Sequence, residues 1–169
     1  MHTTIIGGAD GPTSIYVASP LNNIQWINLF GLLIIILLMV PNIIYAIKNK
    51  DGKNLCTDKI INILEQVGRY GTMFLMVFNI GILEFGFSSV NSMLLYTFGN
   101  LVLILSYWIF WGVYFKRQSL MAALMLAIIP TAIFLLSGIT LQHYLLIVFA
   151  SLFGVCHIYI TYINNVHSK

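Results

Sequence analysis

Long apolar runs, separated by short polar gaps, make up most of the chain beyond residue 23. Each run approaches the roughly 20 residues that a helix needs to cross the hydrocarbon core of a bilayer. The pattern therefore predicts an all-α integral membrane protein, built as a bundle of about five transmembrane helices. The expected spans are about 24–47, 70–87, 92–115, 120–139 and 141–163.

The long polar segment between the first two spans carries a second pattern. Its apolar positions recur at the i, i+3 and i+4 spacing of a helix and are Ile60, Ile61, Leu64 and Val67. Glu65 and Arg69 form an i, i+4 ion pair in the favourable order. Asn54 or Thr57 can cap the first turn. We therefore expect an amphipathic helix over about 57–69, lying on the cytoplasmic membrane surface and leading into the second span.

The composition agrees with a membrane protein. Hydrophobic residues make up 59% of the chain and charged residues only 8%, whereas a soluble domain carries about 25% charged residues. The mean hydropathy is +0.92. There is too little polar surface to cover a water-soluble globule, so the lipid bilayer is the expected partner and a bacterial plasma membrane the expected location.

The net charge of +3 does not indicate a nucleic-acid partner, because the basic residues lie in gaps between the apolar runs or at the C-terminus. They fall in the loop between spans one and two, the loop between spans three and four, and the tail. They are Lys48, Lys50, Lys53, Lys59, Arg69, Lys116, Arg117 and Lys169. The positive-inside rule places those loops in the cytoplasm. We therefore expect an extracytoplasmic N-terminal segment, residues 1–23, and one helical membrane domain, residues 24–169, with a cytoplasmic C-terminus.

Polar side chains within the spans are candidates for function, because they are costly to bury in lipid. Glu84 lies about a turn from the outer end of the second span, so it either reaches the interface or forms a proton or ion site. Asn79 and Asn100 lie at similar depth in adjacent spans. A hydrogen bond between these two amides is the simplest prediction, worth on the order of 1 kcal/mol.

His157 lies in the inner half of the last span. We expect it to be a packed, neutral histidine bonded to a hydroxyl or carbonyl, because no His, Asp or Glu at helical spacing completes a metal site with it. Familiar catalytic motifs are absent from the sequence. If the protein were an enzyme embedded in the membrane, His157 or Glu84 would be its acid–base group. Cys56 and Cys156 have no metal or redox spacing and are expected to be separate thiols.

The most specific string in the chain is IIGGADGPTSI, residues 5–15. Its three glycines and one proline surround Asp10, and they oppose a regular helix while exposing backbone carbonyls. A carboxylate, two hydroxyls and free carbonyls form a hard-oxygen set suited to a small cation. The alternative is a simple Asp-Gly-Pro turn.

This string closely resembles a signature of the beta subunit of sodium-translocating decarboxylases, the oxaloacetate, methylmalonyl-CoA and glutaconyl-CoA family. The resemblance covers about residues 4–19 and implies a sodium ion held by Asp10, with Gly8, Thr13 and Ser14 as neighbouring donors. The chain is much shorter than those subunits, and its remaining spans show no counterpart of their other signature segments. A complete pump subunit is therefore excluded, and the motif stands without its usual scaffold.

These features lead to one main functional hypothesis and two alternatives. The main hypothesis is a small multi-pass membrane protein involved in sodium- or other cation-linked transport, or in its regulation, with no cofactor beyond that ion. The first alternative is a non-enzymatic accessory protein that packs against a larger partner. The second is the membrane-embedded enzyme. A bundle of this size leaves little room for its own aqueous pathway, which favours a homo-oligomer or a larger complex.

Overall fold

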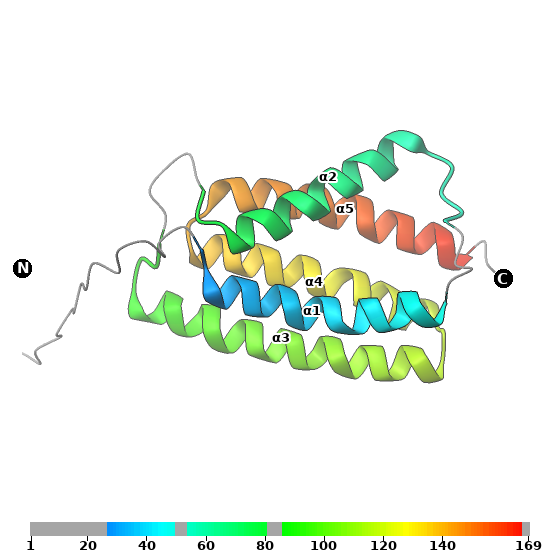
Figure 1. Cartoon of the computed structure of the whole chain (residues 1–169), viewed down its shortest axis with the longest axis horizontal. Coiled ribbons are helices and arrows are strands. Elements are labelled where there is room, and N and C mark those ends of the chain that lie inside the picture. The colour runs from blue at the N-terminus through cyan, green and yellow to red at the C-terminus, as the bar shows by residue number, and fades with distance from the viewer. Residues whose placement is uncertain (1–26, 50–53, 81–85, 167–169) are drawn as a thin grey trace, which may run out of the picture.

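The computed structural model describes residues 27–49, 54–80 and 86–166. Within these ranges the chain forms helices joined by short connections, with one isolated β-bridge between Ile27 and Phe78. The helices are α1 (Leu29–Lys48), α2 (Lys59–Val77), α3 (Val90–Lys116), α4 (Leu120–Thr140) and α5 (Tyr144–Val166). In Figure 1, α1, α3, α4 and α5 run along the long axis of the molecule, whereas α2 is inclined to them.

Four helices, α1, α3, α4 and α5, are long and apolar enough to cross a membrane. The fifth, α2, carries Lys59, Glu65 and Arg69 and is not among them. Large apolar side chains are exposed on the outside of the bundle, among them Ile109 and Val155. The protein is thus an all-helical, multi-pass bundle compatible with a membrane, as the sequence predicts at that level.

The order of packing places α4 at the centre. It contacts α3 on one side and α5 on the other, while α2 packs mainly on α5, and α1 contacts both α2 and α3. Small residues allow close approach where helices cross, as is common in membrane bundles. A Cβ atom added to Gly154 of α5 would lie 2.3 Å from the Thr131 side chain of α4, and one added to Gly138 of α4 would lie 2.7 Å from Ile147 of α5.

Both ends of α1 and α3 are defined by local side-chain chemistry. Asn28 caps α1 by accepting a hydrogen bond from the Gly31 amide, and Ser89 and Ser92 form a reciprocal capping box at the start of α3. At the other end each helix stops at a basic residue, Lys48 or Lys116, where the helix dipole favours positive charge. These bounds, and those of α4 and α5, lie within a few residues of the predicted spans except at the start of α1.

A proline within α1 is compensated by α3. Pro41 has no amide hydrogen, so it leaves the carbonyl oxygen of Leu37 without its helical donor. The indole Nε1 of Trp108 donates to that oxygen at 3.2 Å. At the next position of α1, the Asn42 side chain donates to the Leu38 carbonyl and to the Tyr107 hydroxyl. Side chains at the proline therefore form hydrogen bonds that hold α1 against α3.

The predicted bounds of the second span are wrong. The sequence suggested a surface helix over about 57–69 followed by a span over about 70–87, but one uninterrupted helix, α2, runs from Lys59 to Val77. Asp58 caps it, rather than Asn54 or Thr57, by accepting hydrogen bonds from two amides of the first turn. The helix ends at Phe78, whose extended backbone pairs with Ile27 before α1. The early end of α2 thus coincides with a pairing between segments remote in sequence.

The first half of α2 buries a face of polar and small residues. Its buried positions include Glu65, Gly68 and Thr72, spaced so that they lie on one face toward the bundle. The apolar side chains Leu64 and Val67 lie on the outer side and are exposed. The second half of the helix buries the apolar Leu75 and Met76, so only the first half departs from the apolar-inward pattern of a soluble helix. In that half, Glu65 brings a carboxylate into the α2–α5 interface.

Candidate functional site

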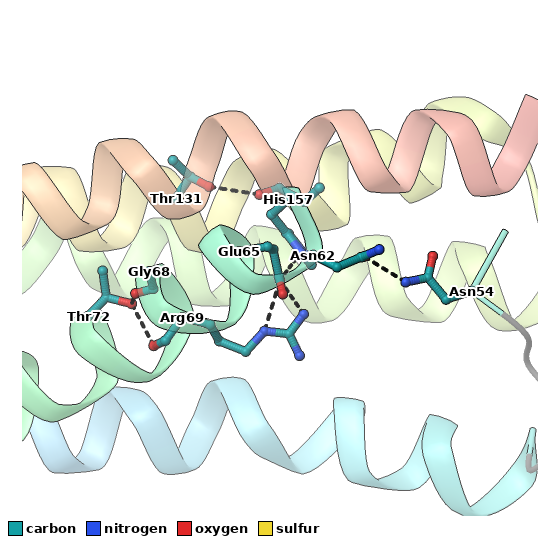
Figure 2. Close-up of polar contacts among 9 residues, drawn as sticks. Asn54, Asn62, Glu65, Gly68, Arg69, Thr72, Thr131 and His157 are labelled. Carbon is teal, nitrogen blue, oxygen red and sulfur yellow. Dashed lines mark hydrogen bonds and ion pairs between the residues drawn. The ribbon is translucent and has the colours of Figure 1, made fainter. Parts of the chain in front are cut away.

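A three-residue cluster lies where α2 packs on α5. The Glu65 side chain is almost fully buried. Its Oε1 accepts a hydrogen bond from Nε of Arg69 at 2.9 Å, and a second from Nη2 of the same guanidinium. The imidazole Nδ1 of His157, on α5, lies 2.8 Å from the same oxygen. Figure 2 shows Arg69 and His157 approaching Glu65 from the two helices.

Helix geometry and one glycine set this arrangement. Arg69 follows Glu65 by four residues, which puts both side chains on neighbouring turns of α2. One turn along the same face, a Cβ atom at Gly68 would lie 2.7 Å from the backbone nitrogen of Phe153. Only glycine allows α5 to approach this closely. The Phe153 ring also stacks on the His157 imidazole, with centroids 4.7 Å apart. His157 is therefore oriented by a ring face on one side and a carboxylate on the other.

The cluster lies on the wall of a polar cavity of about 360 Å³ between α2, α5 and the segment before α2. That segment borders the cavity: Asn54 donates to the Asn62 side chain at 2.8 Å, and the Leu55 amide donates to Asn164 at 2.8 Å. Most lining side chains are polar. The lining residues are Asn54, Asn62, Glu65, Gln66, Arg69, Tyr70, His157, Ile160, Thr161 and Asn164. Such a cavity has room and partners for several water molecules.

The charges of the cluster compensate one another. A buried carboxylate is costly unless charged or polar donors satisfy it. Glu65 has both kinds, because Arg69 supplies a full positive charge and His157 supplies a ring nitrogen. With a neutral imidazole the formal charge of the three residues is zero, and with a protonated imidazole it is +1. The arrangement therefore leaves no isolated negative charge in the interface.

The expectation for His157 was wrong in one respect. The sequence suggested a hydroxyl or carbonyl partner, whereas the partner is the carboxylate of Glu65, 92 residues earlier. The predicted Glu65–Arg69 pair is confirmed, but Glu65 is buried in the bundle rather than lying on a surface helix. One signal could have located it: Glu65, Gly68 and Thr72 form a polar and small stripe at i, i+3 and i+7. In a membrane bundle that stripe is the face that packs against other helices.

The predicted hydrogen bond between Asn79 and Asn100 is replaced by a different contact. Asn100 is buried between α3 and α4, and its side chain donates to the Ser137 hydroxyl at 3.1 Å and to the Tyr96 carbonyl at 2.8 Å. Asn79 lies in the extended segment beyond the end of α2. The prediction assumed that Asn79 and Asn100 lie at similar depth in adjacent helices. Because α2 ends before Asn79, this assumption does not hold.

Several predicted site residues lie outside the described ranges. These are the proposed ion ligands Asp10, Gly8, Thr13 and Ser14, and also Glu84 of the second span. Their roles stay predictions. Among the described residues, no group of three or more His, Cys, Asp or Glu side chains could hold a metal ion. Cys56 and Cys156 are both buried free thiols.

No family model matches the chain, and no curated protein or solved structure shows significant similarity to it. The class of protein is therefore defined by the geometry of the described residues. The protein is a helical, multi-pass bundle with a buried carboxylate, bridged to an arginine and a histidine beside a polar cavity.

Proposed function

We propose that this small multi-pass membrane protein takes part in cation-linked transport or in its regulation. One observation carries the proposal: the buried Glu65 carboxylate bridges Arg69 and His157 on the wall of a polar cavity, within a bundle of apolar helices. Ionisable side chains at such positions are costly, and in membrane proteins they mark ion pathways and proton relays.

The proposed topology has five crossings, with α2 as the second. Contacts at the two ends of α2 support this. The Asn28 amide, before α1, donates to the Val77 carbonyl at one end of α2, and Leu55 reaches Asn164 near the end of α5 at the other. The 19 residues of α2 measure about 28 Å at the usual rise, close to the roughly 30 Å of a hydrocarbon core.

The proposed orientation places the cavity on the cytoplasmic side of a bacterial plasma membrane. Lys48 and Lys116 end α1 and α3, Arg117 follows α3, and Lys59 begins α2. In Figure 1 these helix ends lie at the same end of the bundle, together with the end of α5. The positive-inside rule supports a cytoplasmic location for that end, and the N-terminal segment would then be extracytoplasmic.

The N-terminal motif supports a cation as the substrate. Its resemblance to the sodium-pump signature suggests that Asp10 binds sodium, with Gly8, Thr13 and Ser14 as neighbouring donors. In the proposed topology, Asp10 and the Glu65 cavity face opposite sides of the membrane. A homo-oligomer or a larger membrane complex would supply a continuous pathway, for which one small bundle has little room.

The first test is a sodium titration of the thermal stability of the detergent-purified protein, with potassium as the matched salt. A ligand that binds only the folded state raises its stability by mass action. We expect a sodium-specific rise that Asp10→Asn abolishes, because this change removes the negative charge from the proposed ligand set. Equal curves for the two salts would reject sodium binding, and a rise that persists in Asp10→Asn would reject Asp10 as the ligand.

A flux assay then separates transport from regulation. Proteoliposomes loaded with a pH-sensitive dye or with radioactive sodium report movement of either cation under an imposed gradient. Flux that Glu65→Gln abolishes while the variant stays folded would identify a transporter. Sodium binding without flux by the protein alone would identify a regulatory or accessory subunit. Absence of both binding and flux would reject the proposal.

A second candidate, a membrane-embedded enzyme, is favoured by one observation. A carboxylate on Nδ1 of a histidine prepares the other ring nitrogen to act as a general base, as in hydrolase triads. Glu65 and His157 have this relation. A nucleophile within reach would be required as well, and a screen of His157→Asn against the wild type for hydrolysis of activated esters would test it.

A further inference from the structure

The hydrogen bonds of the cluster determine which nitrogen of His157 carries hydrogen. All three donors meet on Oε1 of Glu65: Nε and Nη2 of Arg69, and Nδ1 of His157. A carboxylate that is paired with a guanidinium is ionised and has no hydrogen to donate, so Nδ1 must be the donor. The hydrogen therefore stays on Nδ1, and Nε2 is the nitrogen that gains or loses a proton.

The imidazole is held in place beside the cavity. Its edge contacts Glu65, and its face stacks on Phe153 with an interplanar angle of 22°. Its side chain is 25% exposed and forms part of the cavity wall. Contacts on the edge and on the face fix the ring plane, while the cavity gives water a route to the side chain. A proton acceptor needs both a fixed orientation and access.

The charged and titratable groups that face His157 come from two helices and from the segment before α2. From α2 they are Glu65, Arg69 and the cavity residue Tyr70. Cys156 precedes His157 on α5, and the segment before α2 adds the buried thiol of Cys56. The third helix packed nearby, α4, has no titratable side chain in its sequence. Because the formal charges of Glu65 and Arg69 cancel, a proton on Nε2 changes the cluster from neutral to +1.

We infer that His157 is a reversible proton-binding site of the α2–α5 cavity, with Nε2 as the titrating atom and Glu65 as the residue that positions it. This inference deepens the proposed function. It rests on that function in one point, that the proton is a cation which the protein moves. Glu65 is a positioning residue, because it acts through the imidazole.

The test is a pH series of long-range proton–nitrogen correlation spectra of the full-length protein labelled with ¹⁵N-histidine, in detergent micelles between about pH 5 and about pH 8. The chain has four histidines, and His157→Asn assigns the signal in question. We expect a neutral form with hydrogen on Nδ1, and a large shift of the Nε2 signal on acidification. A neutral form with hydrogen on Nε2, or an imidazole that stays neutral throughout, would overturn the inference.

Two variants test the positioning role of Glu65. Glu65→Gln keeps an acceptor oxygen and removes the charge, so the Nδ1–H tautomer should persist. Glu65→Leu removes the acceptor, so the neutral ring should become a mixture of both tautomers. An unchanged tautomer in Glu65→Leu would show that Glu65 does not position the ring. If that variant does not fold, a lost Nδ1–H tautomer in Glu65→Gln would overturn the role, and a retained tautomer would support it.

The experiment separates this inference from the proposed function, because the spectra need no ion gradient. A titrating Nε2 without sodium binding and without flux of sodium or protons would reject the proposed function and leave the proton site intact. Sodium flux with an Nε2 that never titrates would reject the proton site and leave the proposed function intact.

Discussion

At the scale of single residues, Glu65 is the side chain that links α2 to α5 through a buried carboxylate. It is buried, and it accepts hydrogen bonds from residues of two helices through one oxygen. Arg69 is 44% exposed and can turn toward water when the carboxylate is removed, so it loses little. His157 is more enclosed and would lose its partner in the interface.

We expect Glu65→Leu to lower the free energy of unfolding by about 1–3 kcal/mol, the usual cost of leaving a buried polar group without its partner. Thermal unfolding of the purified protein in detergent measures the change. Gln66→Leu is the matched control, because Gln66 is an exposed neighbour on the same helix, and it should leave the midpoint nearly unchanged. Equal stability of Glu65→Leu and the wild type would show that the cluster contributes nothing to the fold.

Local spacing was sufficient to predict only part of the site. The Glu65–Arg69 pair follows from an i, i+4 relation that any helix fulfils. The Glu65–His157 contact joins residues 92 positions apart, and nothing in the spacing of either helix specifies it. The prediction for Asn100 failed for a related reason, because its partner Ser137 depends on how α4 packs against α3.

At the scale of helices, the crossing of α2 and α5 depends on a missing side chain. A methyl group at Gly68 would lie 2.7 Å from a backbone atom of Phe153, which cannot move aside as a flexible side chain can. The ion cluster lies one turn away, so separating the helices at this point would also lengthen the contact between Glu65 and His157.

We therefore expect Gly68→Ala to destabilise the protein by about 1–3 kcal/mol, as overpacking usually does. Gly112→Ala is the control, because a Cβ at Gly112 meets nothing within 4 Å. The alanine there should be neutral or should stabilise α3 by up to about 1 kcal/mol through its higher helix propensity. Thermal midpoints of the two variants compare them directly, and a Gly68→Ala protein as stable as Gly112→Ala would contradict the close crossing.

The contact between α1 and α3 allows a double-mutant test. Trp108 donates to the Leu37 carbonyl that Pro41 leaves without a helical donor. Trp108→Phe should cost about 1 kcal/mol in the wild type, the usual net value of one hydrogen bond. In a Pro41→Ala background the restored amide can bond to Leu37, so the same change should cost less. Additive effects in the four proteins of the cycle would show that the indole does not compensate for the proline.

At the scale of the whole molecule, the feature with the largest consequence is the proposed crossing of the membrane by α2. Its ends contact opposite ends of the bundle, although its composition places it outside the four most apolar helices. If α2 crosses, Thr57 and Ser88 lie on opposite sides of the membrane. If α2 lies along the surface, they lie on the same side.

Cysteine labelling decides between these topologies. In a background with Cys56→Ser and Cys156→Ser, the exposed positions Thr57, Ser88 and Gln118 are changed singly to cysteine. A membrane-impermeant maleimide added to intact spheroplasts should label Ser88→Cys, and should label Thr57→Cys and Gln118→Cys only after permeabilisation. Labelling of Gln118→Cys alone from outside would indicate that α2 does not cross. Labelling of Thr57→Cys and Gln118→Cys, without Ser88→Cys, would reverse the proposed orientation.

The sequence alone predicted the helical class, the positions of most helices and the separation of basic from uncharged loops. It could do so because hydrophobic runs, caps and charge placement act over a few residues and along a single element. The tertiary structure alone decided that α2 is one helix, that it ends where Phe78 pairs with Ile27, and that Glu65 meets His157. These features depend on which helices cross and on how closely they approach one another. That approach is set by the absence of a side chain at Gly68, whose effect appears only when the partner helix is in place.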